Sequence, residues 1–493
     1  MTSVSLAKAP LSPSSSPNQE EIVTRVLNEI EARGSEYIDF RFTDTLGVWH
    51  HMTFHKSAVN KDFLIGGIMF DGSSIKGWKR IEDSDMMLVP ANTRLFTDPF
   101  AMHSTLIVIC DVHEPSTNAS YGRDPRATAL AAENYLRLSG IADTVYLGPE
   151  PEFFVFDEVY YKVDSQGSYY AIDSEEGSYP EGPFFSGFDM RNRSTGHRPS
   201  SGQGYFPVAP VDQGSDLRTE MIQRLNEIGL KAEKCHHEVA VSQHEIGFRY
   251  GTLTETADNL QAFKYIVKNV AHEHGKTVTF MPKPVFGDNG SGMHVHMSLS
   301  KEGEPVFLGD QYNNLSQEAL YFIGGILKNA RSINAFTNPT TNSYKRLVPG
   351  FEAPIFKAYS ARNRSAAIRI PHVTDPKSKR IEVRFPDPTA NAYLALSAML
   401  MAGLDGIENK IDPGAAMEKN LFHMDESLIN KDDLLCTSLL EALRELDANR
   451  AFLKKGGVFS DDQIDSYINL RQEEARQVSQ APHPMEFQLY YSS

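Results

Sequence analysis

The chain has 493 residues, and its 48 Lys and Arg against 64 Asp and Glu give a formal net charge of −16. Its 41% hydrophobic and 23% charged residues are typical of a globular protein of two or more domains, which excludes a peptide-sized scaffold. Cys110, Cys235 and Cys436 form no CxxC pair, which excludes a cysteine-rich zinc module and indicates a reducing compartment, so we expect a cytoplasmic protein. The acidic balance disfavours nucleic acid as a partner, and the strongest apolar stretch, residues 394–404, is about half the length of a membrane span, so no membrane is expected either.

A tail and a helix open the chain. Residues 1–17 are rich in Ser, Pro and Ala, which predicts a disordered tail. Within residues 18–34, Ile22, Val26 and Ile30 recur at helical spacing between a capping residue and a glycine. This pattern predicts an amphipathic helix.

A β-hairpin is expected next. Residues 38–43 alternate between apolar and polar, residues 44–47 are rich in turn formers, and residues 48–54 form a second extended run. Together with the helix they indicate a small α+β domain over residues 18–122, with the junction near residues 121–126.

A large α+β domain is expected over residues 123–493, where helical and strand-like segments alternate. Residues 157–204 have little periodicity and predict a long excursion. The predicted helices span about residues 126–139, 214–229, 257–275, 315–331 and 389–407, and the strand-like segments about 144–156, 235–250, 277–299 and 366–385.

Two glutamates stand two residues apart in the first of these strands. Glu150 and Glu152 therefore project from one face, next to Phe153 and Phe154. Like charges in an apolar neighbourhood are costly unless a divalent cation lies between them, although a solvated strand face is the plainer alternative. We therefore predict a metal site here.

More ligands of this kind follow along the chain. Glu238, Glu245 and Glu382 lie in extended segments, and His294 and His296 share one face of a strand after a glycine-rich turn. A His-x-His pair by itself is more often a hydrogen-bonded core pair than a ligand pair. Five glutamates with one or two histidines and no thiolate nevertheless favour Mg²⁺ or Mn²⁺ over Zn²⁺, and two such ions favour phosphoryl chemistry.

A basic segment stands out from the acidic background. Residues 343–384 carry ten Lys or Arg against three Asp or Glu. Arg369 and Arg384 lie in strand-like runs, where Glu382 shares a face with Arg384. Arginine binds carboxylates and phosphates in a bidentate way, which suits ATP with a dicarboxylic substrate. A solvated basic surface is the alternative. A nucleic-acid patch is disfavoured, because this segment lacks the interleaved aromatic residues of a single-strand binding platform.

Seven motifs, in this order, resemble those of type I glutamine synthetase, and the resemblance spans roughly residues 19–493. They are Phe70-Asp-Gly-Ser-Ser-Ile-Lys-Gly-Trp78, Gly148-Pro-Glu-Pro-Glu152, His236-His-Glu-Val-Ala240, Asp288-Asn-Gly-Ser-Gly-Met-His294, Asn338-Pro-Thr-Thr-Asn-Ser-Tyr-Lys-Arg-Leu-Val-Pro-Gly350, Asn363-Arg-Ser365 and Arg384-Phe-Pro-Asp-Pro388.

The resemblance implies a fold, an assembly and ligand sets. It implies a small N-terminal β-grasp domain, a large catalytic domain with a curved antiparallel sheet and flanking helices, and a dodecamer of two hexameric rings with active sites between subunits. By match, the ligands of one ion would be Glu152, Glu238 and Glu245, and those of the other Glu150, His294 and Glu382. The ATP contacts would be Glu233, His296, Ser298, Arg369 and Lys377, the phosphoryl contacts Arg364 and Arg380, and the glutamate contacts Asn289, Gly290, Arg346, Glu352 and Arg384.

The activity that the resemblance implies is the ATP-dependent ligation of ammonia to the γ-carboxylate of glutamate through γ-glutamyl phosphate, for nitrogen assimilation. A carboxylate becomes an acyl donor only when its oxygen is a phosphate leaving group, and ammonium must lose a proton before it attacks. The match gives this second role to Asp71 of a neighbouring subunit and to Glu352 on a closing loop that excludes water, and makes Arg364 catalytic.

Two departures from the family concern regulation. Phe422 stands in an Asn-Leu-Phe sequence where the adenylylated subtype carries a tyrosine, so the phenolic oxygen for that modification is missing. Arg80 resembles the arginine that serves glutamine feedback in the other subtype, whereas residues 157–204 resemble an insertion of the adenylylated one. The subtype features are therefore mixed.

Two alternative functions are open. A γ-glutamyl ligase for a bulkier amine should lack an acidic ammonium pocket, against which Asp71 and Glu352 argue. An inactive structural or regulatory oligomer should have broken metal ligands, whereas the candidate ligands are all present in the sequence.

Overall fold

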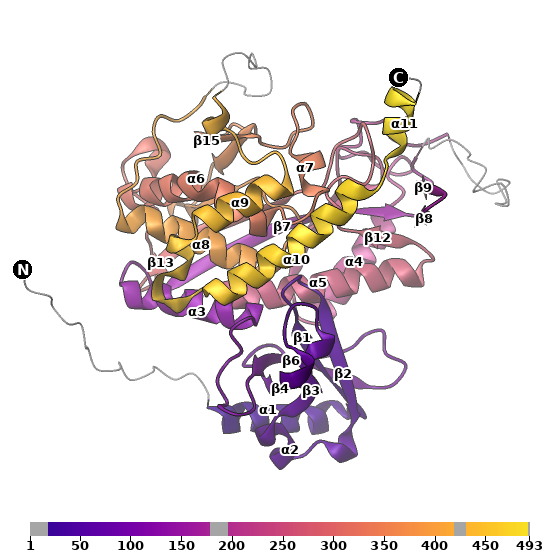
Figure 1. The fold of residues 1–493 in the computed structure, drawn as a ribbon, viewed down its shortest axis with the longest axis vertical. Coiled ribbons are helices and arrows are strands. Elements are labelled where there is room, and N and C mark those ends of the chain that lie inside the picture. Colours follow the sequence, from indigo (N-terminus) through magenta and orange to yellow (C-terminus); the bar gives the residue numbers. More distant parts are fainter. Residues whose placement is uncertain (1–17, 178–195, 419–429, 492–493) are drawn as a thin grey trace, which may run out of the picture. The chain divides into compact units, whose positions relative to one another are not determined.

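The computed structural model describes residues 18–177, 196–418 and 430–491 (Figure 1). The expected disordered tail, residues 1–17, and Phe422 lie outside the described residues. The chain forms two compact units, each of which is described by itself. The smaller comprises Met1–Phe42, His51–Asp71 and Asp85–Ala119, and the larger Thr43–His50, Gly72–Ser84 and Ser120–Ser493.

The first helix of the smaller unit, α1 (Gln19–Arg33), begins and ends where the sequence pattern predicts. The Asn18 side chain accepts a hydrogen bond from the Glu21 amide, and the Glu21 carboxylate accepts one from the Asn18 amide. Gly34, with a φ of 61°, ends the helix in the left-handed conformation that glycine adopts without strain. The predicted amphipathic helix is confirmed, with Val26 on its buried face.

A mixed sheet forms the rest of the smaller unit. Its order is β2-β1-β6-β4-β3 with β5 on β6, so the two strands of the predicted hairpin, β1 and β2, are neighbours. Strand β1 runs parallel to β6. The elements are β1 (Tyr37–Thr43), β2 (Trp49–His55), α2 (Lys61–Gly66), β3 (Ile68–Asp71), β4 (Asp85–Pro90), β5 (Phe96–Thr97) and β6 (Thr105–His113).

A sheet of nine strands, counted over the described residues, runs through the larger unit in the order β10-β11-β7-β13-β17-β16-β15, with β12 on β7 and β14 on β13. Its strand pairs are antiparallel except β15 and β16, which run parallel. The strands are β7 (Thr144–Phe156), β10 (Ala232–His237), β11 (Gln243–Phe248), β12 (Thr277–Thr279), β13 (Met293–Lys301), β14 (Glu304–Pro305), β15 (Phe356–Ala361), β16 (Ala366–Ile370) and β17 (Ile381–Val383).

Two of the predicted strand-like segments are interrupted. The segment 235–250 contains β10 and β11 with a turn between them, in which Ser242 has a φ of 64°. The segment 277–299 contains only the short β12 and most of β13, because residues 280–292 form a loop rich in Gly and Pro. These loops carry polar side chains to the ends of the strands.

The helices of the larger unit include every one that the sequence predicts, and α8 is buried almost throughout against α3, α5 and α6. A Cβ on Gly406 of α8 would lie 2.0 Å from the Tyr321 carbonyl oxygen, so this glycine allows α6 and α8 to pack closely. No described helix is long and apolar enough to cross a membrane. The helices are α3 (Pro125–Ser139), α4 (Ser215–Glu227), α5 (Leu253–Glu273), α6 (Gln317–Thr337), α7 (Ser343–Arg346), α8 (Ala392–Glu408), α9 (Leu439–Ala448), α10 (Asp461–Gln480) and α11 (Pro484–Tyr490).

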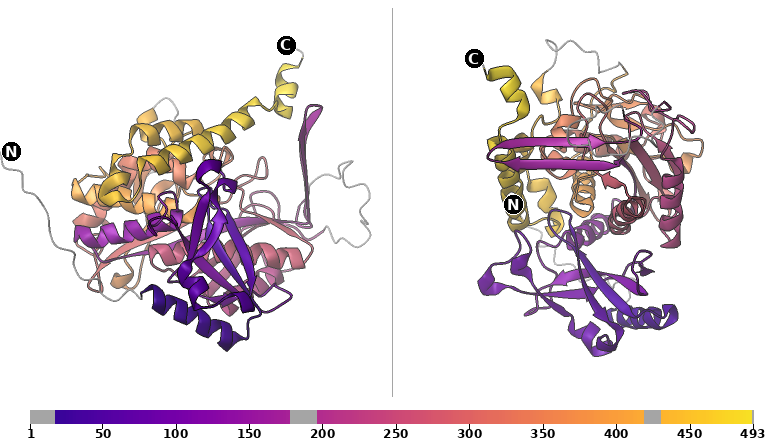
Figure 2. Two further views of the ribbon diagram at one scale, coloured as in Figure 1. Left: turned by 60° about the horizontal axis from the view of Figure 1, so that its bottom comes forward. Right: turned by 90° about the vertical axis from the view of Figure 1, so that its right-hand side faces the viewer.

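The predicted excursion over residues 157–204 begins with a regular hairpin. Strands β8 (Glu158–Asp164) and β9 (Gly167–Asp173) pair with each other over their full length and with no other strand of the described chain. Figure 2 shows this hairpin as a long ribbon that projects from the larger unit. Its exposed Tyr161 and Tyr170 explain why the segment shows no core periodicity.

Candidate active site

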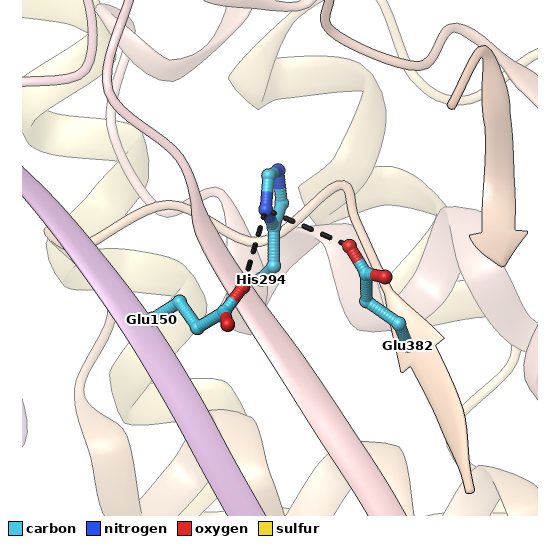
Figure 3. A group of neighbouring side chains, drawn as sticks. All are labelled: Glu150, His294 and Glu382. Carbon is cyan, nitrogen blue, oxygen red and sulfur yellow. Dashed lines mark ion pairs between the residues drawn. The ribbon is translucent and has the colours of Figure 1, made fainter. Parts of the chain in front are cut away.

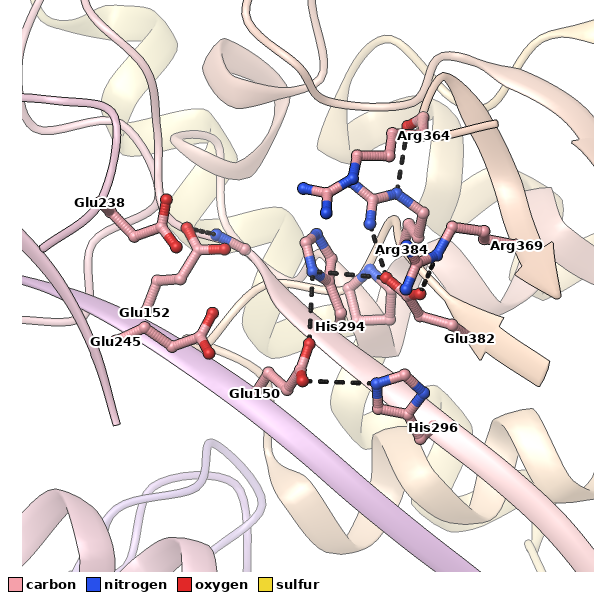
Figure 4. A network of polar contacts seen from close by, with 12 residues as sticks. Glu150, Glu152, Glu238, Glu245, His294, His296, Arg364, Arg369, Glu382 and Arg384 are labelled. Carbon is pink, nitrogen blue, oxygen red and sulfur yellow. Dashed lines mark hydrogen bonds and ion pairs between the residues drawn. The ribbon is translucent and has the colours of Figure 1, made fainter. Parts of the chain in front are cut away.

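The register of the main sheet brings the predicted ligands onto one side of it, which we call the acidic face (Figure 4). Residues directly opposite each other on paired antiparallel strands project from the same face. The opposing pairs are Glu152 with Glu245, Glu150 with His294, and His296 with Glu382. Five consecutive strands thus build one site, because His236 of β10 lies opposite Glu245.

One candidate metal group lies at the β10 end of the acidic face. His236, Glu238 and Glu245 each offer a ligand atom, and these atoms lie within 4.8 Å of one another. The Nε2 atom of His236 is 2.6 Å from Oε1 of Glu238 and 4.0 Å from Oε2 of Glu245. The other Glu245 oxygen is buried and accepts no hydrogen bond within the described chain, although Nζ of Lys234 lies 3.4 Å away. A cation would satisfy this oxygen.

Glu152 lies beside this group and is held from behind. Its Oε2 atom accepts hydrogen bonds from Nε2 of Gln243 at 2.8 Å and from the Gly292 amide at 2.9 Å. Burial and the charges of Glu238 and Glu245 raise the pKa of Glu152 well above its usual value. Burial and the charge of Glu150 likewise raise the pKa of Glu245 to about 7. A cation beside these two carboxylates would favour their ionised forms.

A second candidate group comprises Glu150, His294 and Glu382 (Figure 3). The Nδ1 atom of His294 lies 3.9 Å from Glu150 and 3.7 Å from Glu382. Burial and the positive charges of nearby arginines lower the pKa of His294 well below its usual value, so the ring is a neutral ligand. Burial alone would raise the pKa of Glu150, but the hydrogen bond and charge of His296 lower it to about 2.

Arginines from the basic segment balance Glu382. Arg369 donates to one oxygen of this carboxylate and Arg384 to the other, each at 2.5 Å. Glu382 is only 1% exposed, so these two charge-assisted hydrogen bonds replace its hydration. The predicted anion site and the predicted metal site therefore share this residue.

A cavity of about 410 Å³, the acidic cavity, opens on this face. All six predicted metal ligands and the predicted glutamate-binding residues line it. Nδ2 of Asn289 donates to the Glu352 carboxylate at 3.3 Å. Arg346 is 3% exposed, and its guanidinium donates to the backbone carbonyls of Arg384, Phe385 and Pro386, which fixes it in the wall of the cavity.

A neighbouring cavity of about 660 Å³, the outer cavity, collects most of the predicted ATP contacts. Arg364 and Arg369 line the acidic cavity instead. Glu150 and Lys234 line both cavities, so the two spaces meet at these side chains. The predicted contacts in the outer cavity are Glu233, His296, Ser298, Lys377 and Arg380.

Three predicted residues lie outside these cavities or outside the description. Asp71 ends β3 in the smaller unit. The side chain of Arg80, which precedes a short 3-10 helix, is 87% exposed, and its guanidinium lies 3.9 Å from the Glu82 carboxylate. Phe422 is not among the described residues. The roles expected of all three stay predictions.

Comparison with known proteins decides the family. The family model of the glutamine synthetase catalytic domain matches residues 122–490, and that of the glutamine synthetase β-grasp domain matches residues 34–115. A glutamine synthetase of Azospirillum brasilense is 57% identical over 95% of this chain and 99% of its own length. One of Escherichia coli (strain K12) is 55% identical over 96% of this chain and 99% of its own length.

The chain belongs to the glutamine synthetase family. A cryo-EM structure of Plasmodium falciparum glutamine synthetase superposes with a TM-score of 0.86 at 28% identity, covering 98% of this chain and 100% of that one. The expected β-grasp domain and curled catalytic sheet are thereby confirmed. As a family member the chain is an ATP-dependent ligase that forms glutamine from glutamate and ammonia, with divalent metal ions.

The donor set of the acidic face fits the divalent metals of a glutamine synthetase. It offers carboxylates and imidazoles, and Cys235, the cysteine nearest to it in the sequence, belongs to neither candidate group. The unsatisfied buried oxygen of Glu245 provides a further position for an ion. Hard oxygen ligands of this kind suit Mg²⁺ or Mn²⁺ better than Zn²⁺.

Reasoning from the sequence missed several residues of this glutamine synthetase site. His236 was not among the expected ligands, and it is the register of β10 on β11 that places it opposite Glu245. Tyr205 lines the acidic cavity from the segment after the 178–195 gap, where no periodicity marks it. Tyr146 and Tyr250 line the outer cavity, and their ring centroids lie 5.5 Å apart. They are far apart in the sequence and meet because Leu147 of β7 pairs with Gly251, just after β11.

Proposed function

We propose that the acidic cavity binds glutamate, that the outer cavity binds ATP, and that the γ-phosphoryl group passes between them beside Glu150. The observation that carries this proposal is that Glu150 lines both cavities. Because His296 and Lys234 lie 3.4 Å and 3.7 Å from its carboxylate, the junction is strongly polar. Transfer there would convert the γ-carboxylate of glutamate into an acyl phosphate.

Two metal sites are assigned to the acidic cavity beside this junction, with Mg²⁺ or Mn²⁺ as the ion. When bound, such ions neutralise the charge that develops on a transferring phosphoryl group. Gln243 and the Gly292 amide orient Glu152, and Arg369 and Arg384 orient Glu382, so the ligands are held before the ions arrive. The proposed ligands of one ion are Glu152, Glu238 and Glu245, joined by His236, and those of the other are Glu150, His294 and Glu382.

The charged groups around the junction divide between the two substrates. Glu233, Ser298 and Lys377 are assigned to ATP with His296 and Arg369, and Arg364 and Arg380 to the phosphoryl group. Asn289, Gly290, Arg346 and Arg384 are assigned to glutamate. A Cβ on Gly290 would lie 2.3 Å from the Pro282 carbonyl oxygen, so only glycine fits at this position in the lining of the acidic cavity.

Ammonium needs a proton acceptor next to the acyl phosphate. We assign this role to Glu352, whose carboxylate lies at the rim of the acidic cavity, and to Asp71 of a neighbouring subunit. Arg364 would stabilise the departing phosphate. A closed loop around Glu352 would keep water from the acyl phosphate.

Assembly, location and regulation extend the proposal. A dodecamer of two hexameric rings would supply Asp71 across subunits, in the cytoplasm. Residues 18–122 and 123–493 would be the two domains of each subunit.

Regulation is proposed to combine features of two subtypes. Since Phe422 has no phenolic oxygen, adenylylation cannot occur at that position. Arg80 is assigned to glutamine feedback, so the subtype is mixed.

Phosphate release from ATP in the presence of glutamate tests the reaction. Release should require ammonium, form glutamine stoichiometrically, occur with Mg²⁺ or Mn²⁺, and fall sharply in Asp71→Asn. Release with a bulkier amine but not with ammonium would replace this function by that of another γ-glutamyl ligase. Absence of turnover with either metal would favour an inactive oligomer.

A further inference from the structure

Lys283 lies in the loop between β12 and β13, and its ammonium contacts the loop between α7 and β15. Its amide donates to Oδ1 of Asn342 at 2.7 Å, and Nδ2 of Asn342 donates to its carbonyl at 3.0 Å, so the Lys283 backbone is fixed. Its ammonium donates to the Asp288 carbonyl and lies 3.7 Å from the centroid of the Phe351 ring. This is a short cation–π contact.

The anchor of this cation is itself rigid. Asp288 is only 4% exposed. Its carboxylate accepts hydrogen bonds from the amides of Gly202, Val241 and Asn289. Burial lowers the pKa of Lys283 to about 8, and a poorly hydrated ammonium gains more from an aromatic face than a hydrated one.

The residue after Phe351 is Glu352, which has an unfavourable backbone. Its φ of 60° lies in the left-handed region, where a side chain with a Cβ is strained. Such a conformation persists only when its surroundings hold it. The contacts that flank it are the Lys283 ammonium on the Phe351 ring and the Asn289 amide on the Glu352 carboxylate.

We propose that Lys283 is a positioning residue for Glu352: its ammonium, held by the Asp288 carbonyl, clamps the Phe351 ring and thereby keeps the Glu352 carboxylate at the acidic cavity. This inference rests on the proposed role of Glu352 as a proton acceptor for ammonium. The clamp touches neither the metal groups nor the outer cavity, so it should act on ammonium capture and on water exclusion, not on ATP binding.

Steady-state kinetics of two variants, one on each side of the clamp, test the inference. Lys283→Met and Phe351→Leu should each raise the KM for ammonium about 10-fold and release part of the phosphate without forming glutamine. The KM for ATP should stay within about twofold of wild type, which a general structural defect would not allow. The double variant should be no worse than either single one, because both remove the same contact.

Conservative variants and a distant lysine are the controls. Lys283→Arg keeps the cation and Phe351→Tyr keeps the ring, so both should retain near wild-type kinetics. Lys454→Met removes an exposed ammonium that lies 2.7 Å from Asp461, and should change nothing in the assay. Thermal unfolding of every variant identifies any that misfold. If Lys283→Met misfolds, the kinetics of Phe351→Leu decide whether the clamp exists.

The outcomes separate the clamp from the proposed function when Glu352→Gln is measured in parallel. If Glu352→Gln impairs ammonium use while Lys283→Met or Phe351→Leu behaves like wild type, the clamp is refuted and the role of Glu352 stands. If Glu352→Gln itself has a wild-type KM for ammonium and full coupling, the role of Glu352 is refuted, and the clamp with it.

Discussion

Buried carboxylates occur in two settings in the larger unit, and their charge is balanced in opposite ways. On the acidic face, Glu152 and Glu245 lie beside other carboxylates, and burial together with that repulsion raises their pKa values. Among the helices, Asp258 of α5 accepts two hydrogen bonds from the Arg126 guanidinium at 3.0 and 3.1 Å and one from the Tyr393 hydroxyl at 2.6 Å. One setting leaves charge for a ligand to neutralise, whereas the other is neutralised by the chain.

Asp405 of α8 shows the second setting again. Nζ of Lys455 lies 2.8 Å from its carboxylate and Nζ of Lys328 lies 3.5 Å away. Burial would raise the pKa of Asp405, but the hydrogen bonds from Lys455 and Asn329 lower it. Carboxylates that are buried among other carboxylates, such as Glu152 and Glu245, therefore indicate a ligand site, whereas Asp258 and Asp405, whose partners come from the chain itself and lie outside both cavities, contribute to stability.

The largest effect is expected for Glu245→Gln. The substitution removes a proposed metal ligand, so kcat should fall more than about 100-fold. The metal-free protein should be no less stable than wild type, because a neutral amide relieves the repulsion at this position. Activity assays and urea unfolding in a chelator measure both quantities, with the exposed Glu273→Gln as the control. A loss of stability without a loss of activity would show that Glu245 contributes to stability, as Asp258 and Asp405 do, and not to metal binding.

Asp258→Asn should show the reverse pattern. Breaking a buried ion pair leaves the Arg126 charge uncompensated, which should lower the free energy of unfolding by about 3–5 kcal/mol. The kcat of the folded protein should stay within about twofold of wild type, since the pair touches neither cavity. Denaturant titration with activity measured per folded molecule checks this. A large loss of kcat in the fully folded variant would contradict a purely stabilising role for Asp258.

Removal of the metal should affect the acidic face and leave the ion pairs among the helices intact. At a free metal concentration of about 100 times the Kd, binding stabilises the folded state by about 2.7 kcal/mol, so a chelator should lower the unfolding temperature of wild type. The same decrement should persist in Asp258→Asn and shrink in Glu245→Gln. Differential scanning calorimetry with and without Mn²⁺ measures the decrement; an equal value in all three proteins would argue against the acidic face as the metal site.

The smallest effect is expected for Asp405→Asn, and it should depend on pH. The folded-state pKa of Asp405 lies below its ordinary value of 3.8, so its contribution is fully present above that pH and is lost as the pH falls through the folded-state pKa. At pH 7 the variant should be about 1–2 kcal/mol less stable than wild type. Urea unfolding at pH 7, 5 and 3.5 should show the gap narrowing at acid pH. A gap that widens there would contradict the lowered pKa.

Local patterns in the sequence account for much of the fold and part of the site. The capping box of α1 and the hairpin of β1 and β2 form where the spacing predicts them, because caps, helical faces and strand alternation depend on residues a few positions apart. The interruptions between β10 and β11 and between β12 and β13 were not predicted, because extended loops and strands have similar composition.

The candidate site was only partly accessible to the same reasoning. Alternation places Glu150 and Glu152 on one face without knowledge of any other strand. Glu238, Glu245, Glu382 and the pair His294 and His296 were candidates from their residue types and extended setting. Their division between two ions came from the family motifs, and neither source pointed to His236 as a ligand. The contact between Lys283 and Phe351 has no sequence signal at all, since it joins two irregular loops 68 positions apart in the chain.

The sequence already contains the parts of this protein: an acidic chain with hard metal ligands, a concentrated basic segment, and helices and strands whose faces follow from local periodicity. Their arrangement comes from the strand order β10-β11-β7-β13-β17-β16, which the folded chain alone reveals. This order lines up His236, Glu245, Glu152 and Glu150, His294 and His296, Glu382 and Arg369 across one face. The physical reason is that side-chain direction is set by each strand's own geometry, whereas strand partners are chosen by the burial of apolar surface between segments far apart in the chain.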